Sequence, residues 1–538
     1  MRSILIASLT FFCSTSLCAQ YKIDSSRVFN GHTVQLDKSD KLLPRNVGDK
    51  NPYDHFLHLR WNFIKTKVPN SPGPEPRSSY PQYFFYCAFI DSAGYLLPDK
   101  WMNDVGEKMP MWLESARLYK DYSGDGEPLE RAKQLVDYSL EHGITKPDFS
   151  WPNFPYTAAN AGELEFTGFT GRFAEHDLHV DHAGDLGSAY YKCFLLFGDN
   201  KYRKAAIDVA DVLASKIQKG SSTHSPWPYM VNAKTGKTVS EYGTNWFGCI
   251  RLLSMLIEHK EGNVEAYTKT LETVREWLLQ YPFKNGLWVD GHTDTHVSGT
   301  TNLSNLSASN AGLYLYDNPG FSDAYKKLLP SLIEWTEKNF VFKGNKDEPF
   351  QMWGANIVSE QVAFMPKMDY QTARYAAQCA RWYRLSGNEE YRDKAFRALN
   401  FVTYCNDSTG KAFESPFTKG VNSWWSDSYG ECPIMFYHAF AGMPEWAPAN
   451  ENHVLYSSGI IRNVEYGAQL LSYEAIEKSG SEHLRLDFKP ALISIDGQAI
   501  SPGKYPDSPV YIRSLSEGDY SLVIRRSKNG KVLIKGKQ

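Results

Sequence analysis

The chain has 538 residues, a formal net charge of −3 and an aromatic content of 14%. A charge this close to neutral argues against a nucleic acid or an anionic membrane as the partner, because both are bound through an excess of basic residues. The length exceeds what one ordinary hydrophobic core needs, so we expect a large repeat domain or two domains.

The N-terminus has the pattern of a secretory signal peptide. A charged start precedes an apolar run over 4–12, and the small residue Ala19 is followed by a polar glutamine. Such a run is too short to cross a bilayer as a helix. We therefore expect a signal peptide over 1–19 and a periplasmic or secreted protein. Residues 20–79, rich in proline and charge near their end, are expected to wrap the body that follows.

Short turns of similar sequence recur along the next part of the chain, roughly every 55–75 residues, a period typical of stacked helical hairpins. Each turn follows an apolar helical stretch and precedes another. A glycine ends the first helix in a left-handed conformation, and Asp or Asn caps the second. The region 80–446 is therefore predicted to hold roughly six hairpins, or about twelve helices. The turns begin at Gly124, Gly198, Gly262, Asn318 and Gly387.

The connections between the hairpins are long. Because the helices alternate in direction, all tight turns should lie at one end of the helical body and all long loops at the other. Loops of this length in a compact domain are usually functional, although they can also simply cover the end of the helices. We expect the functional site on the face that the loops share. The loops span 143–180, 220–241, 282–306, 342–368 and 406–427.

The C-terminal part, residues 447–538, has a different pattern. The helical periodicity is lost, and apolar and polar residues alternate over 484–488 and 520–526. The pair Asn529 and Gly530, with alternating residues on both sides, is a strong hairpin signal. We predict a small β-sandwich-like domain here.

The long loops contain aromatic, amide and titratable residues, which is the inventory of a site that binds a sugar and breaks its bonds. Aromatic rings can stack on sugar faces, although large cores also use them. The candidate catalytic residues are His182, Tyr242, His292, Glu241 and Asp294. The candidate substrate-binding residues are Trp151, Arg172, His176, Trp227, Asn245, Trp246, Asn310, Trp353, Asp369 and Trp425.

A histidine triplet in the first long loop, at 176, 179 and 182, could suggest metal ligands. We expect residues 176–180 to be irregular, with histidines that bond to the loop backbone, so no metal site and no cofactor is predicted. A structural Ca²⁺ on the acidic loops lacks a complete motif. His182 is the preferred catalytic residue, because the first turn of an inner helix favours the neutral imidazole that a base needs.

Several other candidate residues can be interpreted either as part of the site or as structural residues. Tyr242 and Asn245 lie near the start of an inner helix, where core packing and capping compete with a role in the site. Asp294 lies between His292 and His296, on one side of the run if it is extended. Trp425 could stack on a sugar or pack on the β domain. The six cysteines outside the signal peptide are scattered, which predicts buried small hydrophobic residues rather than disulfides or a zinc site.

The signal peptide, the helical hairpins, the aromatic loops and the C-terminal β module together resemble the (α/α)6-toroid carbohydrate-active enzymes of Bacteroidota. These include unsaturated uronyl hydrolases, toroid polysaccharide lyases and an oligosaccharide dehydratase type associated with ulvan. The resemblance implies a mainly α toroid with a small β domain, and an acidic poly- or oligosaccharide as the partner. It is architectural, so no catalytic residue follows from it.

Three functions fit these features. In β-elimination at a uronate, a base removes a carbon-bound proton, a polar group neutralises the carboxylate and an acid protonates the departing oxygen. His182, Tyr242, His292, Asn310 and Arg172 could supply these roles, which favours elimination. Hydrolysis needs two carboxylates, for which the pairs are Glu241 with Asp369 or Glu163 with Asp294. The third function is glycan binding without catalysis.

Overall fold

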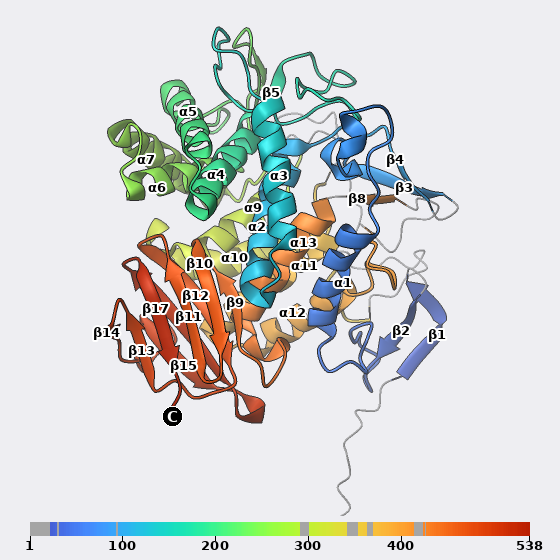
Figure 1. Ribbon diagram of the computed structural model, residues 1–538, viewed down its shortest axis with the longest axis vertical. Helices are drawn as coiled ribbons and strands as arrows, with labels where there is room; N and C mark the ends of the chain where they lie inside the picture. The colour runs from blue at the N-terminus through green and yellow to red at the C-terminus, as the bar shows by residue number, and fades with distance from the viewer. Residues whose placement is uncertain are drawn as a thin grey trace, which may run out of the picture.

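The computed structural model describes residues 22–29, 32–92, 95–290, 301–341, 353–362, 369–413, 423–425 and 427–537. Twelve helices of this described part form two concentric rings, and α13 packs against α2 to close the inner one. The predicted (α/α)6 toroid with a C-terminal β domain is therefore confirmed (Figure 1). The inner helices are α2 (Val105–Ser123), α4 (Val180–Phe197), α6 (Phe247–His259), α9 (Asn305–Asp317), α11 (Asp369–Ser386) and α13 (Asp427–Gly442). The outer helices are α1 (Pro52–Thr66), α3 (Glu127–His142), α5 (Asn200–Lys216), α7 (Val264–Gln280), α10 (Tyr325–Asn339) and α12 (Glu389–Val402), and the short α8 (Pro282–Asn285) follows α7.

The two rings differ in how their helices are buried. On α3, Leu129, Ala132, Leu135 and Val136 form a single apolar stripe, as an amphipathic surface helix requires. On α4, small and apolar residues are buried on most sides of the helix. A helix that is apolar nearly all round can be stable only if neighbours surround it, so the pattern places α4 in the inner ring.

Helix α1 lies before residue 80, so the predicted start of the helical domain leaves it out. Phe56 stacks on Phe436 of α13 with ring centroids 4.6 Å apart. Arg60 forms a buried ion pair of 2.7 Å with Asp369 of α11. These contacts give α1 the first outer position, and the segment between α1 and α2 is one more long connection at the loop end.

The tight turns have the predicted geometry. Gly198 ends α4 with φ of 79°, and the Asp199 side chain accepts a hydrogen bond of 2.9 Å from the backbone N–H of Lys201. Gly387 has φ of 69°. A left-handed residue after the last helical turn lets the chain reverse, and glycine adopts that conformation without a steric penalty.

At the opposite end of the helices, consecutive long loops contact one another, as the alternation of helix direction predicts. The Thr244 hydroxyl donates to the Val289 carbonyl at 2.8 Å, and the Asn302 amide donates to the Gln361 side chain at 2.8 Å. Small sheets also join the segments at this end. They contain β5 (Asp177–His179), β6 (Met230–Asn232) and β7 (Thr238–Ser240), and β3 (Ala88–Ser92), β4 (Tyr95–Pro98) and β8 (Ser423–Trp425); β1 (Lys22–Phe29) and β2 (His32–Leu36) pair separately.

The C-terminal domain consists of two antiparallel sheets around a core of its own. The first sheet contains β10 (Ile461–Gly467), β11 (Leu470–Ala475), β17 (Gly530–Lys535), β13 (Leu492–Ile495) and β14 (Gln498–Ala499). The second contains β15 (Val510–Ser514), β16 (Tyr520–Ser527), β12 (Ser479–Leu486) and β9 (His453–Ser457).

The hairpin predicted at Asn529 and Gly530 does not form. β16 pairs with β12 and β15, whereas β17 pairs with β11 and β13. Leu522 on β16 and Val532 on β17 are fully buried in one core that the two sheets share. The turn therefore crosses from one sheet to the other, because each strand buries its apolar side chains better between partners of its own sheet.

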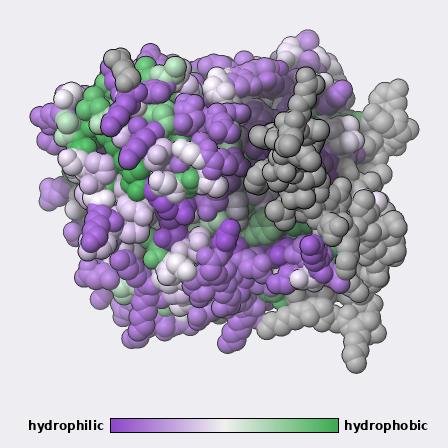
Figure 2. All heavy atoms as spheres, turned by 90° about the horizontal axis from the view of Figure 1, so that it is seen from below, coloured by the Kyte–Doolittle hydropathy of each residue, from purple (hydrophilic) through white to green (hydrophobic). Residues whose placement is uncertain are grey.

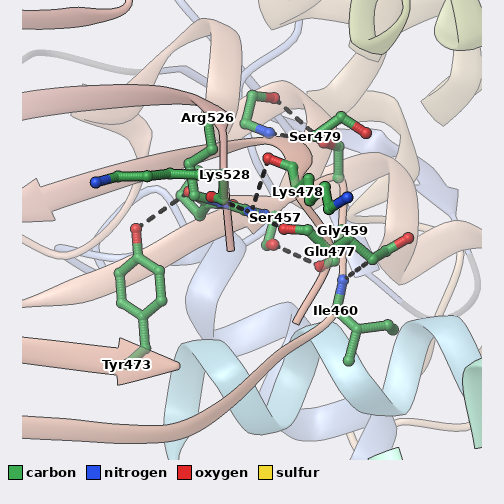
Figure 3. A network of polar contacts seen from close by, with 12 residues as sticks. Ser457, Gly459, Ile460, Tyr473, Glu477, Lys478, Ser479, Arg526 and Lys528 are labelled. Carbon is green, nitrogen blue, oxygen red and sulfur yellow. Dashed lines mark hydrogen bonds and ion pairs between the residues drawn. The ribbon is translucent and has the colours of Figure 1, made fainter. Parts of the chain in front are cut away.

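The β domain packs against the tight-turn end of the toroid, away from the loops around β5 (Figure 1). Arg117 of α2 donates to the Ser457 carbonyl at 2.9 Å. Glu258 of α6 accepts a hydrogen bond of 2.6 Å from the Ser479 hydroxyl. Beside these contacts, the Glu477 carboxylate accepts a hydrogen bond from the backbone N–H of Ile460 (Figure 3). The two domains are thus joined by these polar contacts and by Leu455 and Ile460 of the β domain, which belong to the apolar core of the toroid.

The surface is mixed in character. On the face shown in Figure 2, hydrophilic residues predominate and hydrophobic ones gather mainly in one region at the upper left. No helix of the described chain is long and apolar enough to span a membrane. The six described cysteines are buried, as predicted, and they are unpaired.

Candidate functional site

A cavity of about 250 Å³ lies along the axis of the toroid. All six inner helices or the residues just before them line it, and strands of the β domain line its end at the tight turns. Toward the loop end the polar lining residues are Glu107, His182, Asn245, Asn310 and Arg374. Toward the β domain they include Lys192, Asp317, His438, Tyr456 and Glu477.

His182 lies at the loop end of the cavity, and its imidazole contacts two neighbouring side chains. It lies in the first turn of α4, and its side chain is 9% exposed. Its Nδ1 atom lies 3.6 Å from Oδ1 of Asp104, the residue that caps α2. Its ring also meets the ring of His179 edge to face, with centroids 5.1 Å apart. Asp104 and His179 therefore fix the orientation of the imidazole.

The charges around His182 decide which group holds the proton. Burial alone would lower the pKa of His182, but Asp181, once it ionises, and Asp104 outweigh burial and raise the pKa well above its ordinary value. Burial opposes ionisation of Asp104, but the nearby His182 imidazole holds the pKa of that carboxyl below its usual range. Burial raises the pKa of Asp181 to about 8. The neutral imidazole expected from the helix dipole is therefore wrong, since nearby carboxylates act more strongly than the dipole.

Glycines let the inner helices approach one another beside His182. A Cβ atom on Gly106 of α2 would lie 2.8 Å from the His182 Cβ and 2.7 Å from the Thr157 Cβ. A Cβ on Gly248 of α6 would lie 2.2 Å from the Asp185 carboxylate of α4. Both distances are far below van der Waals contact, so the packing of α2, α4 and α6 around the site requires glycine at these positions.

A chain of polar contacts crosses the opposite wall of the cavity. The Asn310 amide donates to the Asn245 side-chain oxygen at 3.0 Å, and Arg374 donates to the Asn310 oxygen at 2.7 Å. Arg374 also forms a buried ion pair with Glu431 of α13. The contacts tie α6, α9, α11 and α13 together, and they fix amide groups that can bind hydroxyl or carboxylate oxygens.

One cation in the cavity differs from the others. Arg251 of α6 is half-buried and lines the cavity, and within the described residues it makes no ion pair. Its guanidinium lies 5.8 Å from the centre of the Tyr314 ring. By contrast, Arg374 and Arg117 are each paired with carboxylates. Arg251 can therefore accept an anionic group of a ligand without first breaking an ion pair.

The structure brings three of the predicted site residues together. His182, Asn245 and Asn310 all line the cavity. Each lies within the first two turns of an inner helix or directly before one. Because the inner helices surround a common axis, side chains at these positions come from distant parts of the sequence into one space.

Most of the predicted aromatic residues are not available to a ligand. The Trp227 indole donates to the Leu213 carbonyl at 2.9 Å, and the Trp246 indole donates to the Gly243 carbonyl at 2.9 Å. The Tyr242 ring packs edge to face on Trp277, with centroids 5.7 Å apart. Buried rings of this kind hold the loops on the toroid rather than stacking on a sugar. The five that are at most 7% exposed are Trp151, Trp227, Tyr242, Trp246 and Trp353.

The remaining predicted residues of the described part have other roles. Asp369 is fully buried in its ion pair with Arg60, and Glu241 is exposed, so this pair cannot act as the two carboxylates of a hydrolase. Arg172 lies over the Trp101 ring at 5.0 Å, outside the lining of the cavity. The His176 Nδ1 atom hydrogen-bonds to the Tyr156 hydroxyl at 2.7 Å.

Two predicted catalytic residues, His292 and Asp294, lie outside the described residues. Trp425 ends strand β8, opposite Ala88 of β3. The histidine triplet does not form a common site, because His176 bonds to Tyr156 whereas His179 and His182 face each other. Residues 177–179, expected to be irregular, form β5. No group of three potential ligands arranged for a metal ion occurs in the described part of the chain.

Sequence reasoning missed Asp104, Glu107, Arg251 and Arg374. The first two follow the connection between α1 and α2, which was not counted among the long loops because α1 was not recognised as a helix of the toroid. A signal existed for Arg251, since it is the only Arg or Lys in the apolar helix α6. A buried charge within an apolar helix needs a partner or a function.

No protein-family model and no curated protein matches the sequence. Among solved structures, a D-mannose isomerase is similar with a TM-score of 0.51 and 12% identity, over 73% of this chain and 97% of that chain. A cellobiose 2-epimerase from Spirochaeta thermophila DSM 6192 has a TM-score of 0.49 and 10% identity, over 74% and 99%. An unsaturated glucuronyl hydrolase specific for heparin has a TM-score of 0.43 and 9% identity, over 72% and 95%. The expected architectural resemblance is confirmed.

Proposed function

We propose that the protein is a saccharide-processing enzyme that cleaves a carbon–oxygen bond by β-elimination at a uronate residue of an acidic oligosaccharide. The observation that carries the proposal is one cavity that contains both a proton-transfer group and a cation, Arg251, that makes no ion pair with the described residues. His182 is held by Asp104 at the loop end, and Arg251 lies deeper on the neighbouring inner helix. The D-mannose isomerase of similar fold, whose name states a sugar substrate, supports a saccharide as the ligand.

The reaction assigns a role to each group. Arg251 and the amides of Asn245 and Asn310 bind the uronate carboxylate and make the adjacent carbon-bound proton more acidic. The Glu107 carboxylate, which lines the cavity near His182, accepts that proton. The electron pair of the C–H bond forms the carbon–carbon double bond, and the C–O bond breaks. His182 donates its proton to the departing oxygen.

The raised pKa of His182 suits an acid rather than the base first expected. At neutral pH the imidazole carries a proton, and Asp104 stabilises that charge. Asp104 is buried and absent from the lining of the cavity, so it acts through His182 as a positioning residue.

Hydrolysis by two carboxylates is the second candidate, on a different pair from those expected. Asp185 lines the cavity one turn below His182, and burial raises the pKa of its carboxyl, as a general acid requires. Glu107 would serve as the base or nucleophile. This reaction needs no cation beside the bond, so the position of Arg251 in the lining of the cavity favours elimination.

Incubation with ulvan oligosaccharides separates the two reactions. Elimination produces a conjugated enol-uronate, whose ultraviolet absorbance rises, and a product one water lighter than the hydrolysis product by mass spectrometry. His182→Gln should lower kcat about 100- to 10,000-fold, the usual contribution of general acid catalysis. His259→Gln, outside the cavity, is the control. Cleavage without an absorbance rise would overturn elimination, and binding without cleavage would overturn the enzyme proposal.

A further inference from the structure

A second polar cluster lines the cavity near the β domain, and the proposed reaction does not use it. His438 of α13 is 6% exposed and lines the cavity. Its ring lies against the ring of Tyr456 from β9, with centroids 4.3 Å apart. The Tyr456 hydroxyl donates to Asp317 at 2.5 Å, and Arg381 forms an ion pair of 3.0 Å with the same carboxylate. The cluster thus joins α9, α11 and α13 to the β domain.

The contact with Arg381 fixes the protonation of His438. The His438 Nδ1 atom lies 3.2 Å from Nη1 of Arg381. A guanidinium only donates hydrogen bonds, so Nδ1 must be the acceptor. The ring is then neutral and carries its proton on Nε2. Burial also lowers the pKa of His438 to about 3.

The Nε2–H group is left to face the cavity. None of the described residues forms a hydrogen bond to it, and His438 belongs to the cavity lining. A donor that no described residue satisfies is available to water or to an oxygen of a ligand in the cavity. The ring cannot turn to bury this atom without losing its contact with Arg381. The donor is therefore fixed in direction as well as in protonation.

His438 and His182 are too far apart to act on one bond. All inner helices run from the loop end to the tight-turn end, and His438 lies about nine residues further along its helix than His182. At 1.5 Å per residue this corresponds to roughly 14 Å along the axis. A ligand that contacts both histidines must therefore contain more than one sugar residue.

We propose that His438, with Tyr456 and Asp317, forms a second saccharide subsite that the β domain completes, so that the substrate is an oligosaccharide longer than a disaccharide whose end sugar binds there. The Nε2–H donates to an oxygen of that sugar, and the Asp317 carboxylate accepts from a hydroxyl. This inference rests on the proposed function, and it assigns the β domain a direct role in substrate binding through Tyr456.

Two substitutions separate the role of the Nε2 atom from that of the Nδ1 contact with Arg381. His438→Asn places a carbonyl near the Nδ1 position but no group near Nε2, whereas His438→Gln can place an amide N–H near Nε2. Binding of an ulvan disaccharide and an ulvan tetrasaccharide is measured by calorimetry. We expect His438→Asn to raise the Kd of the tetrasaccharide about three- to tenfold, the loss of one hydrogen bond, and to leave that of the disaccharide unchanged. His438→Gln should restore much of the loss.

The control is His259→Asn, because His259 also lies beside a tyrosine ring, that of Tyr191, but does not line the cavity. Equal loss for both sugars, or none for the tetrasaccharide, overturns the subsite. If His438→Asn weakens binding of the tetrasaccharide alone, but the unsubstituted protein cleaves no bond, the proposed reaction is overturned and the subsite remains. Absence of binding of both sugars to the unsubstituted protein overturns both proposals.

Discussion

The Nδ1 atom of His182 lies 3.6 Å from Oδ1 of Asp104, across the contact between α4 and α2. The two residues belong to consecutive inner helices, so their distance depends on how closely these helices pack. The packing of the inner helices therefore sets the distance between Asp104 and His182, and with it the effect of the carboxylate on the imidazole.

Substitution of Asp104 should shift the pH dependence of the enzyme. Asp104→Asn removes a charge that raises the pKa of His182, so the imidazole should lose its proton at a lower pH. If the protonated form is the acid, the alkaline limb of the kcat/KM profile should move to lower pH. Asp208→Asn, on the outer helix α5, is the control. An alkaline limb that stays in place would show that His182 is not the acid.

Gly106→Ala should disturb both the fold and the site. The added methyl group would overlap with Thr157 and with the Cβ of His182. We expect the free energy of unfolding to fall by about 1–3 kcal/mol, as for other overpacked cores, and kcat to fall because His182 is displaced. Denaturant unfolding and steady-state kinetics measure the two effects. Gly320→Ala is the matched control, since no atom lies within 4 Å of the added Cβ; an equal effect of both substitutions would contradict the close approach.

Arg251→Gln should lower the activity on charged substrates. Loss of a hydrogen-bonded cation facing a carboxylate should lower kcat/KM on uronate oligosaccharides about 10- to 100-fold. Binding of a carboxyl-reduced oligosaccharide, which lacks the charge, should change little. Arg392→Gln, at an exposed ion pair on α12, serves for comparison. The same loss with the neutral sugar would argue against Arg251 as the carboxylate group's partner.

Asp181 should make the fold less stable as the pH rises. Its pKa is raised by burial to about 8, whereas an unfolded Asp titrates near 3.9. The folded state therefore binds the proton more tightly than the unfolded state. Its contribution to stability is present below about pH 4 and is lost as the pH rises to about 8. Asp181→Asn cannot titrate, so its free energy of unfolding should decline less than that of the unsubstituted protein over this window in denaturant titrations. Parallel curves for the two proteins would contradict the raised pKa.

Local features of the sequence were enough to predict the architecture. Gly198 and Asp199 act within a single turn, and the stripe on α3 depends only on the helical period, so both could be recognised without knowledge of distant contacts. The alternation of tight turns and long loops then predicted a functional site at one end of the inner helices, which stays a prediction. His182 and Asn245 were proposed because they lie at the start of such helices, and Asn310 because it follows the third long loop.

The direction of each side chain was decided only by the tertiary structure. Trp227 and Trp246 are of the residue type expected in a sugar site. Both are nevertheless buried, because the loops pack their aromatic rings on the toroid. Asp104 meets His182, and Arg251 faces the same cavity, only because the inner helices close into a ring. The helical period fixes which residues share a face of one helix, but burial and proton affinity depend on neighbours that are distant in sequence.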